Sequence, residues 1–116
     1  MKFSFLQENL SKGLQTIMHA VPTKSSLPIL SNVLIETEKG RIKLSATNLE
    51  TAITTYVGAS VEESGSITVP AKLLKDFISN LSPGTLEAQT KDEILIISSK
   101  TTKSRFNGNS SKDFPN

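Results

Sequence analysis

The sequence predicts an α+β fold made of one strand-helix-strand-strand-strand unit that occurs twice, with two adjacent helices packed on antiparallel sheet. Three observations support this prediction. Leucine and isoleucine recur at helical spacing in two segments, alternating polar and apolar runs surround each segment, and the apolar positions of the first half recur in the second. A chain of 116 residues is long enough for one such domain and too short for two.

The first half begins with a strand at Lys2 to Phe5, in which both phenylalanines point to the same side. A helix over Leu6 to Val21 follows, because apolar residues recur there every three or four positions, and Pro22 is expected to end it. After a loop that contains proline and serine, the alternating runs at 32–47 and 50–60 predict a hairpin and a third strand.

The second half repeats this order. Ser66 to Val69 predicts a strand, and Pro70 is suited to the first turn of a helix over Ala71 to Leu81. The segment 85–100 predicts a hairpin, and 102–108 predicts a third strand. Each helix has one apolar face that sheet must cover, so we expect both helices on one side with their polar faces outward together.

The apolar positions of the two halves coincide at two constant offsets. At an offset of 64 residues, the first strand and helix (Phe3, Phe5, Leu10, Leu14 and Ile17) fall on Ile67, Val69, Leu74, Ile78 and Leu81. At an offset of 52, the first hairpin (Leu34, Ile42, Leu44 and the Lys39–Gly40 turn) falls on Leu86, Ile94, Ile96 and Lys91–Asp92. The surface residues do not coincide, as expected for two copies that share only a packing scheme.

Composition argues against several classes of function. The chain has no cysteine and a single histidine, His19, so neither a thiolate site nor a histidine cluster can form. The carboxylates are spread over predicted strands and turns, so we expect no catalytic site, metal or cofactor. No apolar run approaches the roughly 18 residues that span a bilayer, and we expect a cytoplasmic protein.

The polar faces of the two predicted helices carry a mild excess of lysine. They present Lys12, Gln15, Thr16 and His19 on the first helix and Lys72, Lys75, Asp76 and Ser79 on the second, with Lys24 in the loop after the first. Such faces are either ordinary solvated surface or a weakly basic surface that contacts phosphates without reading bases, because lysine is a mobile point charge. The two arginines, Arg41 and Arg105, fall on predicted strands, which argues against sequence-specific recognition.

The strength of such a contact can be bounded. If about three lysines contacted phosphate, a fourfold rise in salt would weaken binding by only about 40-fold. A contact of this kind is too weak to hold the duplex in place and is suited to gliding.

Six short segments resemble a known family. MKF at the start, LPIL at 27–30, ATNLE at 46–50, ITVPAKLLKDF at 67–77, SRF at 104–106 and DFPN at the end resemble the first domain of the bacterial DNA polymerase III beta subunit, the sliding clamp. The resemblance implies the DNA-clamp fold and a processivity factor without chemistry of its own. It also implies a homodimeric ring with three such domains in each subunit. Duplex DNA passes through the hole of that ring, and the replicative polymerase and the clamp loader bind to it.

The resemblance also suggests which residues meet DNA and the second subunit. Lys24 matches a basic position that faces the duplex, and we expect Lys12, Gln15 and Lys72 on the same surface. The strand around Phe106 matches the edge at which the first domain meets the third domain of the other subunit. The residues expected at that contact are Lys103, Arg105, Phe106 and Asn107, with Leu73 from the second helix beside them.

Two features depart from the family pattern. Gly108 stands where the family usually has an apolar side chain, which removes contact worth about 1.5 to 3 kcal/mol if that position is buried. The sequence also stops at Asn116, where the family continues, so we expect residues 1–116 to be a single clamp domain, the first of three. The alternative is an independent interaction module that pairs through an exposed sheet edge and has no DNA role.

Overall fold

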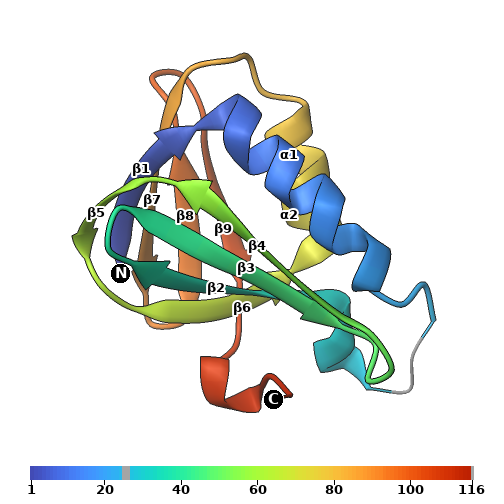
Figure 1. Cartoon of the computed structure of the whole chain (residues 1–116). Helices are drawn as coiled ribbons and strands as arrows, with labels where there is room; N and C mark the ends of the chain where they lie inside the picture. The colour runs from blue at the N-terminus through green and yellow to red at the C-terminus, as the bar shows by residue number, and fades with distance from the viewer. Residues whose placement is uncertain (25–26, 116) are drawn as a thin grey trace.

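In the part of the chain that the structure describes, two antiparallel sheets and two α-helices enclose one apolar core (Figure 1). The computed structural model describes residues 1–24 and 27–115. The five-stranded sheet has the order β5-β1-β7-β8-β9, and the four-stranded sheet has the order β4-β3-β2-β6. The elements are β1 (Lys2–Leu6), α1 (Gln7–Ile17), β2 (Asn32–Glu38), β3 (Arg41–Thr47), β4 (Ala52–Gly58), β5 (Ser60–Glu63), β6 (Ser66–Pro70), α2 (Ala71–Ser79), β7 (Thr85–Lys91), β8 (Ile94–Ser98) and β9 (Lys103–Asn107).

The first strand of each repeat lies in the sheet of the other repeat. β1 pairs with β7, where Phe5 lies opposite Leu86, and β6 pairs with β2, where Val69 lies opposite Val33. The β-α-β-β-β unit therefore occurs twice, as predicted from the sequence. Because each sheet needs a strand from the other half, the two halves bury their apolar side chains in one common core.

The predicted offset of 52 between the two hairpins is wrong by one residue. The buried Ile42 corresponds to the buried Leu95, and the turn residue Gly40 corresponds to Glu93, so the offset is 53. A slip of one residue exchanges the two faces of a strand. Ile94, which the offset of 52 matches with Ile42, accordingly lies on the outer face of its sheet and is only half-buried.

The first helix is shorter than predicted. Leu6 keeps the extended backbone of β1, with φ −91° and ψ 133°, and α1 therefore begins at Gln7. At its other end α1 stops at Ile17, and the chain tightens into a 3₁₀ turn over Met18–Ala20. The helix thus ends before Pro22, which is not needed to stop it.

The remaining differences from the predicted elements are small. α2 ends at Ser79, two residues early, and the second hairpin turns at Asp92–Glu93 rather than one residue before. The short strand β5 (Ser60–Glu63), which pairs with β1, was not predicted because four residues show too little alternation. In the loop between α1 and β2, Pro28–Ser31 forms a 3₁₀ turn, and the two serines before it, residues 25 and 26, lie outside the described residues.

Gly13 lets α1 lie close to the four-stranded sheet. A Cβ added at this position would lie 2.8 Å from Val57 Cγ2 and 3.0 Å from Leu44 Cδ1. Atoms this close must move apart, and the branched Val57 side chain has little freedom to do so. Glycine weakens a helix by about 1 kcal/mol relative to alanine, so the close approach explains why a glycine occupies the middle of α1.

We expect Gly13→Ala to lower the free energy of unfolding by about 1 kcal/mol. Overpacking a core costs about 1 to 3 kcal/mol, which exceeds the roughly 1 kcal/mol gained in helix propensity. Urea denaturation measures the change. In a Val57→Ala background the closest contact is absent and only the movable end of the Leu44 side chain remains near the new methyl group, so the same substitution should cost less or stabilise the chain. A stabilising effect in the otherwise unchanged chain would contradict the close approach.

Candidate nucleic-acid interface

α1 and α2 lie antiparallel and side by side against the sheets (Figure 1). The side-chain Nε2 of Gln7 donates a buried hydrogen bond of 2.7 Å to the carbonyl oxygen of Ile78. The hydroxyl oxygens of Ser11 and Ser79 are 3.4 Å apart. Both contacts join the first half of α1 to the end of α2, so the polar faces of the helices form one outward surface, as predicted.

We call this outward surface the helix surface. It comprises the side chains that the sequence placed opposite the apolar stripes, Lys12, Gln15, Thr16, His19, Lys72, Lys75, Asp76 and Ser79. All of them are exposed except Lys75, which is half-buried. The apolar stripes face the other way, because Leu10, Leu14, Leu74 and Ile78 are buried in the core.

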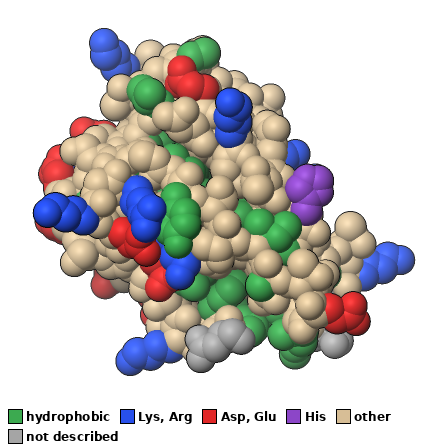
Figure 2. Space-filling model, viewed as in Figure 1, with side chains coloured by type: hydrophobic (Ala, Val, Ile, Leu, Met, Phe, Trp, Pro, Cys, Tyr) green, Lys and Arg blue, Asp and Glu red, His purple; other side chains and the backbone are tan. Residues whose placement is uncertain are grey.

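The helix surface is weakly basic. α1 carries Glu8 and Lys12, and α2 carries Lys72, Lys75 and Asp76, so the two helices together have a net charge of +1. On the face of the molecule in Figure 2, blue and red side chains are scattered and do not gather into one basic patch. Such a surface can attract a polyanion, but only weakly.

Lys12 and Gln15 lie on opposite flanks of the exposed face of α1. Gln15 Nε2 donates a hydrogen bond of 3.3 Å to the hydroxyl of Ser11, which is on the flank toward α2. Lys12 instead lines a groove of about 220 Å³ together with Tyr56, on the flank toward β4. The two residues of α1 that were predicted to contact DNA, Lys12 and Gln15, therefore extend toward different sides of its exposed face.

Two further lysines that were predicted to contact DNA, Lys24 and Lys72, lie outside α1 and are exposed. The Lys72 side chain is 79% exposed and lies 3.3 Å from the carboxylate of Asp76. Lys24 is also exposed and follows the 3₁₀ turn at the end of α1. All four side chains predicted to meet DNA thus reach solvent, and their contact with DNA stays a prediction.

β9 is an edge strand of the five-stranded sheet and carries the residues predicted to meet a second subunit. Lys103, Arg105 and Asn107 are exposed and alternate with the inner face of the strand. β9 pairs with β8 on one side, and within the described residues no strand of the sheet lies beyond it. Phe106 is only 8% exposed and packs edge to face on Phe77 with a centroid distance of 5.4 Å, so most of its ring contacts this chain.

Leu73 completes this edge. Its side chain is 63% exposed, and it precedes Phe77 by one helical turn, on the flank of α2 that faces β9. An exposed apolar side chain beside an unpaired strand edge is suited to the addition of a strand from another chain or domain. The part that Leu73 and the β9 residues play at a subunit interface stays a prediction.

Gly108 has a structural explanation that the sequence did not reveal. A Cβ at this position would lie 2.6 Å from the carbonyl oxygen of Thr68 and 2.9 Å from Ile67 Cδ1. The next residue, Asn109, exchanges backbone hydrogen bonds with Thr68, and the buried Asn32 side chain donates to Thr68 Oγ1 over 2.9 Å. A side chain at Gly108 would therefore point into this chain rather than toward a partner.

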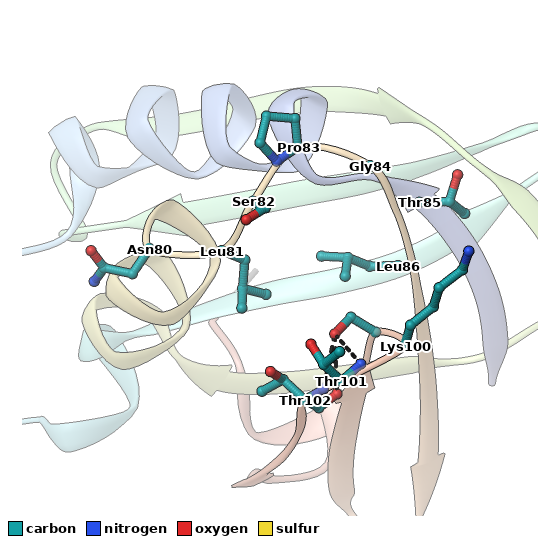
Figure 3. Close-up of a pocket in the computed structure, with 11 residues that line it drawn as sticks. Asn80, Leu81, Ser82, Pro83, Gly84, Thr85, Leu86, Lys100, Thr101 and Thr102 are labelled. Atoms are coloured by element: carbon teal, nitrogen blue, oxygen red, sulfur yellow. Dashed lines mark hydrogen bonds between the residues drawn. The ribbon is translucent and has the colours of Figure 1, made fainter.

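A cavity of about 660 Å³ lies between the loop after α2 and the loop after β8 (Figure 3). Among the described residues that line it, Lys100 is the one charged residue, and the other side chains are apolar, hydroxyl or amide groups. Over residues 1–24 and 27–115 no three His, Cys, Asp or Glu side chains are grouped so that they could hold a metal ion. In the same part of the chain no helix is long and apolar enough to cross a membrane.

Comparison with known sequences gives a consistent answer. The family model described as "DNA polymerase III beta subunit, N-terminal domain" matches residues 1–116. The beta sliding clamp of Synechococcus elongatus is 35% identical over 118 residues, which cover 99% of this chain and 32% of the relative. The beta sliding clamp of Escherichia coli K12 is 30% identical over 118 residues, which cover 100% and 32%. The chain thus spans about a third of the length of these curated relatives.

Solved structures confirm the predicted α+β clamp fold, with two adjacent helices on antiparallel sheets. A beta sliding clamp of Caulobacter crescentus matches with a TM-score of 0.96 at 29% identity and covers 100% of this chain and 32% of its own. A sliding clamp of Bartonella birtlesii bound to griselimycin matches with a TM-score of 0.95 at 32% identity and the same coverage.

Gly108→Ala should destabilise the chain by about 1 to 3 kcal/mol, because the new methyl group meets a backbone oxygen that cannot move without disturbing β6. Gly58→Ala is the matched control, since no atom lies within 4 Å of a Cβ at Gly58. Both free energies of unfolding follow from urea denaturation. Equal effects of the two substitutions would show that Gly108 is not packed against Thr68.

Proposed function

The chain belongs to the family of the DNA polymerase III beta subunit, N-terminal domain, and we propose that it is the first of three domains of a sliding clamp. In this proposal the full-length protein is a processivity factor of the bacterial replicative DNA polymerase. Two subunits close into a ring that encircles duplex DNA and slides along it through non-specific contacts. The clamp is an accessory subunit without catalytic activity of its own, and as a replication factor it works in the cytoplasm.

The observation that carries the proposal is the continuous helix surface of α1 and α2. Its cations are lysines, which attract phosphates as mobile point charges and lack the rigid, planar donor fork of arginine. Lys12, Lys24 and Lys72 are exposed, but the net charge of α1 and α2 together is only +1, so their attraction for phosphate is weak. Contacts that are few, weak and indifferent to base sequence allow a ring to move along the duplex.

The edge strand β9 supports the assembly part of the proposal. Its outer backbone edge pairs with no strand among the described residues. This edge, the exposed Lys103, Arg105 and Asn107, and the nearby Leu73 would join the third domain of the other subunit. The polymerase and the clamp loader would bind the full-length protein, in a cleft formed by the second and third domains. The alternative, an interaction module without a DNA role, is not favoured, because the family match covers the whole chain.

The DNA part of the proposal is tested in the full-length protein. Lys12→Glu with Lys24→Glu should shorten the retention of the loaded clamp on circular duplex DNA. The slope of log affinity against log salt should fall by about 0.9 for each lysine that contacts a phosphate. The control carries Lys39→Glu and Lys91→Glu, which make the same charge change at exposed hairpin positions. Retention that is equal in both variants would remove Lys12 and Lys24 from the DNA site.

A further inference from the structure

The charges on α2 are arranged against the preference of its own dipole. Lys72 lies in the first turn, where a helix favours anions, and Asp76 lies in the last turn, where it favours cations. α2 has no acidic residue in its first turn and no basic residue in its last. Helix stability therefore does not account for this pattern, and in particular it does not account for Asp76.

Asp76 forms ion pairs with both lysines of the helix. Its Oδ2 is 3.3 Å from Lys72 Nζ, and its Oδ1 is 4.0 Å from Lys75 Nζ. The carboxylate is half exposed and Lys72 is mostly exposed, so these ion pairs contribute little to folding. The order of the pair, with lysine before the acid, is also the weaker one on a helix.

The same carboxylate has a large effect on the helix surface. The net charge of α1 and α2 together is +1, and without Asp76 it would be +2. An anion within 4.0 Å of both ammonium groups also competes with any phosphate for them. A phosphate that binds Lys72 must first displace Asp76 or accept its repulsion.

We propose that Asp76 limits the strength of the DNA contact by holding Lys72 and Lys75, so that each phosphate contact on α2 remains brief. This inference rests on the proposed clamp function and names a residue that regulates the same surface. Asp76 does not touch DNA in this account and is a positioning residue that acts through the two lysines. The benefit is mobility, because a clamp that binds the backbone tightly slides slowly.

The test compares Asp76→Asn with Asp92→Asn. Both substitutions remove one negative charge, and Asp92 lies in the β7–β8 turn with φ 52°, a conformation that asparagine accepts readily. The ¹⁵N-labelled chain is titrated with a short duplex at two salt concentrations that differ fourfold, and the amide shifts of α1 and α2 give the affinity. Asp76→Glu, which keeps the charge, should behave as the unchanged chain does, and thermal melting checks that each variant is folded.

We expect Asp76→Asn to bind more tightly and with a salt slope steeper by about 0.9, as one more phosphate contact would give. The affinity ratio of variant to unchanged chain should then fall by about 3.5-fold across the fourfold rise in salt. An unchanged slope for Asp76→Asn, or an equal change for Asp92→Asn, would overturn the role of Asp76 while the DNA contact stands. If the amides of α1 and α2 in the unchanged chain do not respond to the duplex at the lower salt, the DNA contact of the helix surface is contradicted, and the role of Asp76 falls with it.

Discussion

The exchange of first strands between the two repeats is the constraint on which the rest of the structure depends. β1 completes the sheet of the second repeat, and β6 completes the sheet of the first. Each helix follows its exchanged strand without a loop, since β1 ends at Leu6 and β6 ends at Pro70. The pairing of the strands therefore also fixes where the helices begin, and it places them side by side in opposite directions.

The helix of each repeat packs on its sheet through different side chains. Gly13 of α1 and Phe77 of α2 are equivalent positions, and so are Val57 of β4 and Phe106 of β9. In the first repeat the missing side chain of Gly13 lets the helix backbone lie close to Val57. In the second repeat the rings of Phe77 and Phe106 occupy the equivalent space, with a centroid distance of 5.4 Å. The contact between α2 and its sheet is therefore made by larger side chains than the contact of α1. The exposed Leu73 lies next to this aromatic pair, beside the edge of the sheet.

The sequence predicted much of this fold because periodicity reports which face of an element is buried. It misplaced the second hairpin by one residue because Glu93 adopts the positive φ that glycine has at the equivalent Gly40, and a glutamate gives no such signal. The strand exchange could not be read either, since pairing between distant segments leaves no local pattern. The outward lysines were predicted from the positions of the apolar stripes, whereas the ion pairs of Asp76 and the contact of Gly108 with Thr68 required the structure.

The central claim, that the two helices lie side by side as one surface, is tested most directly by a disulfide across them. The chain has no cysteine, and the hydroxyl oxygens of Ser11 and Ser79 are 3.4 Å apart. A chain with Ser11→Cys and Ser79→Cys should form an internal disulfide under mild oxidation when folded and lose this preference in denaturant. A control with Ser11→Cys and Ser64→Cys should remain reduced. A folded double variant that does not cross-link, or that cross-links no better than the control, would contradict the account.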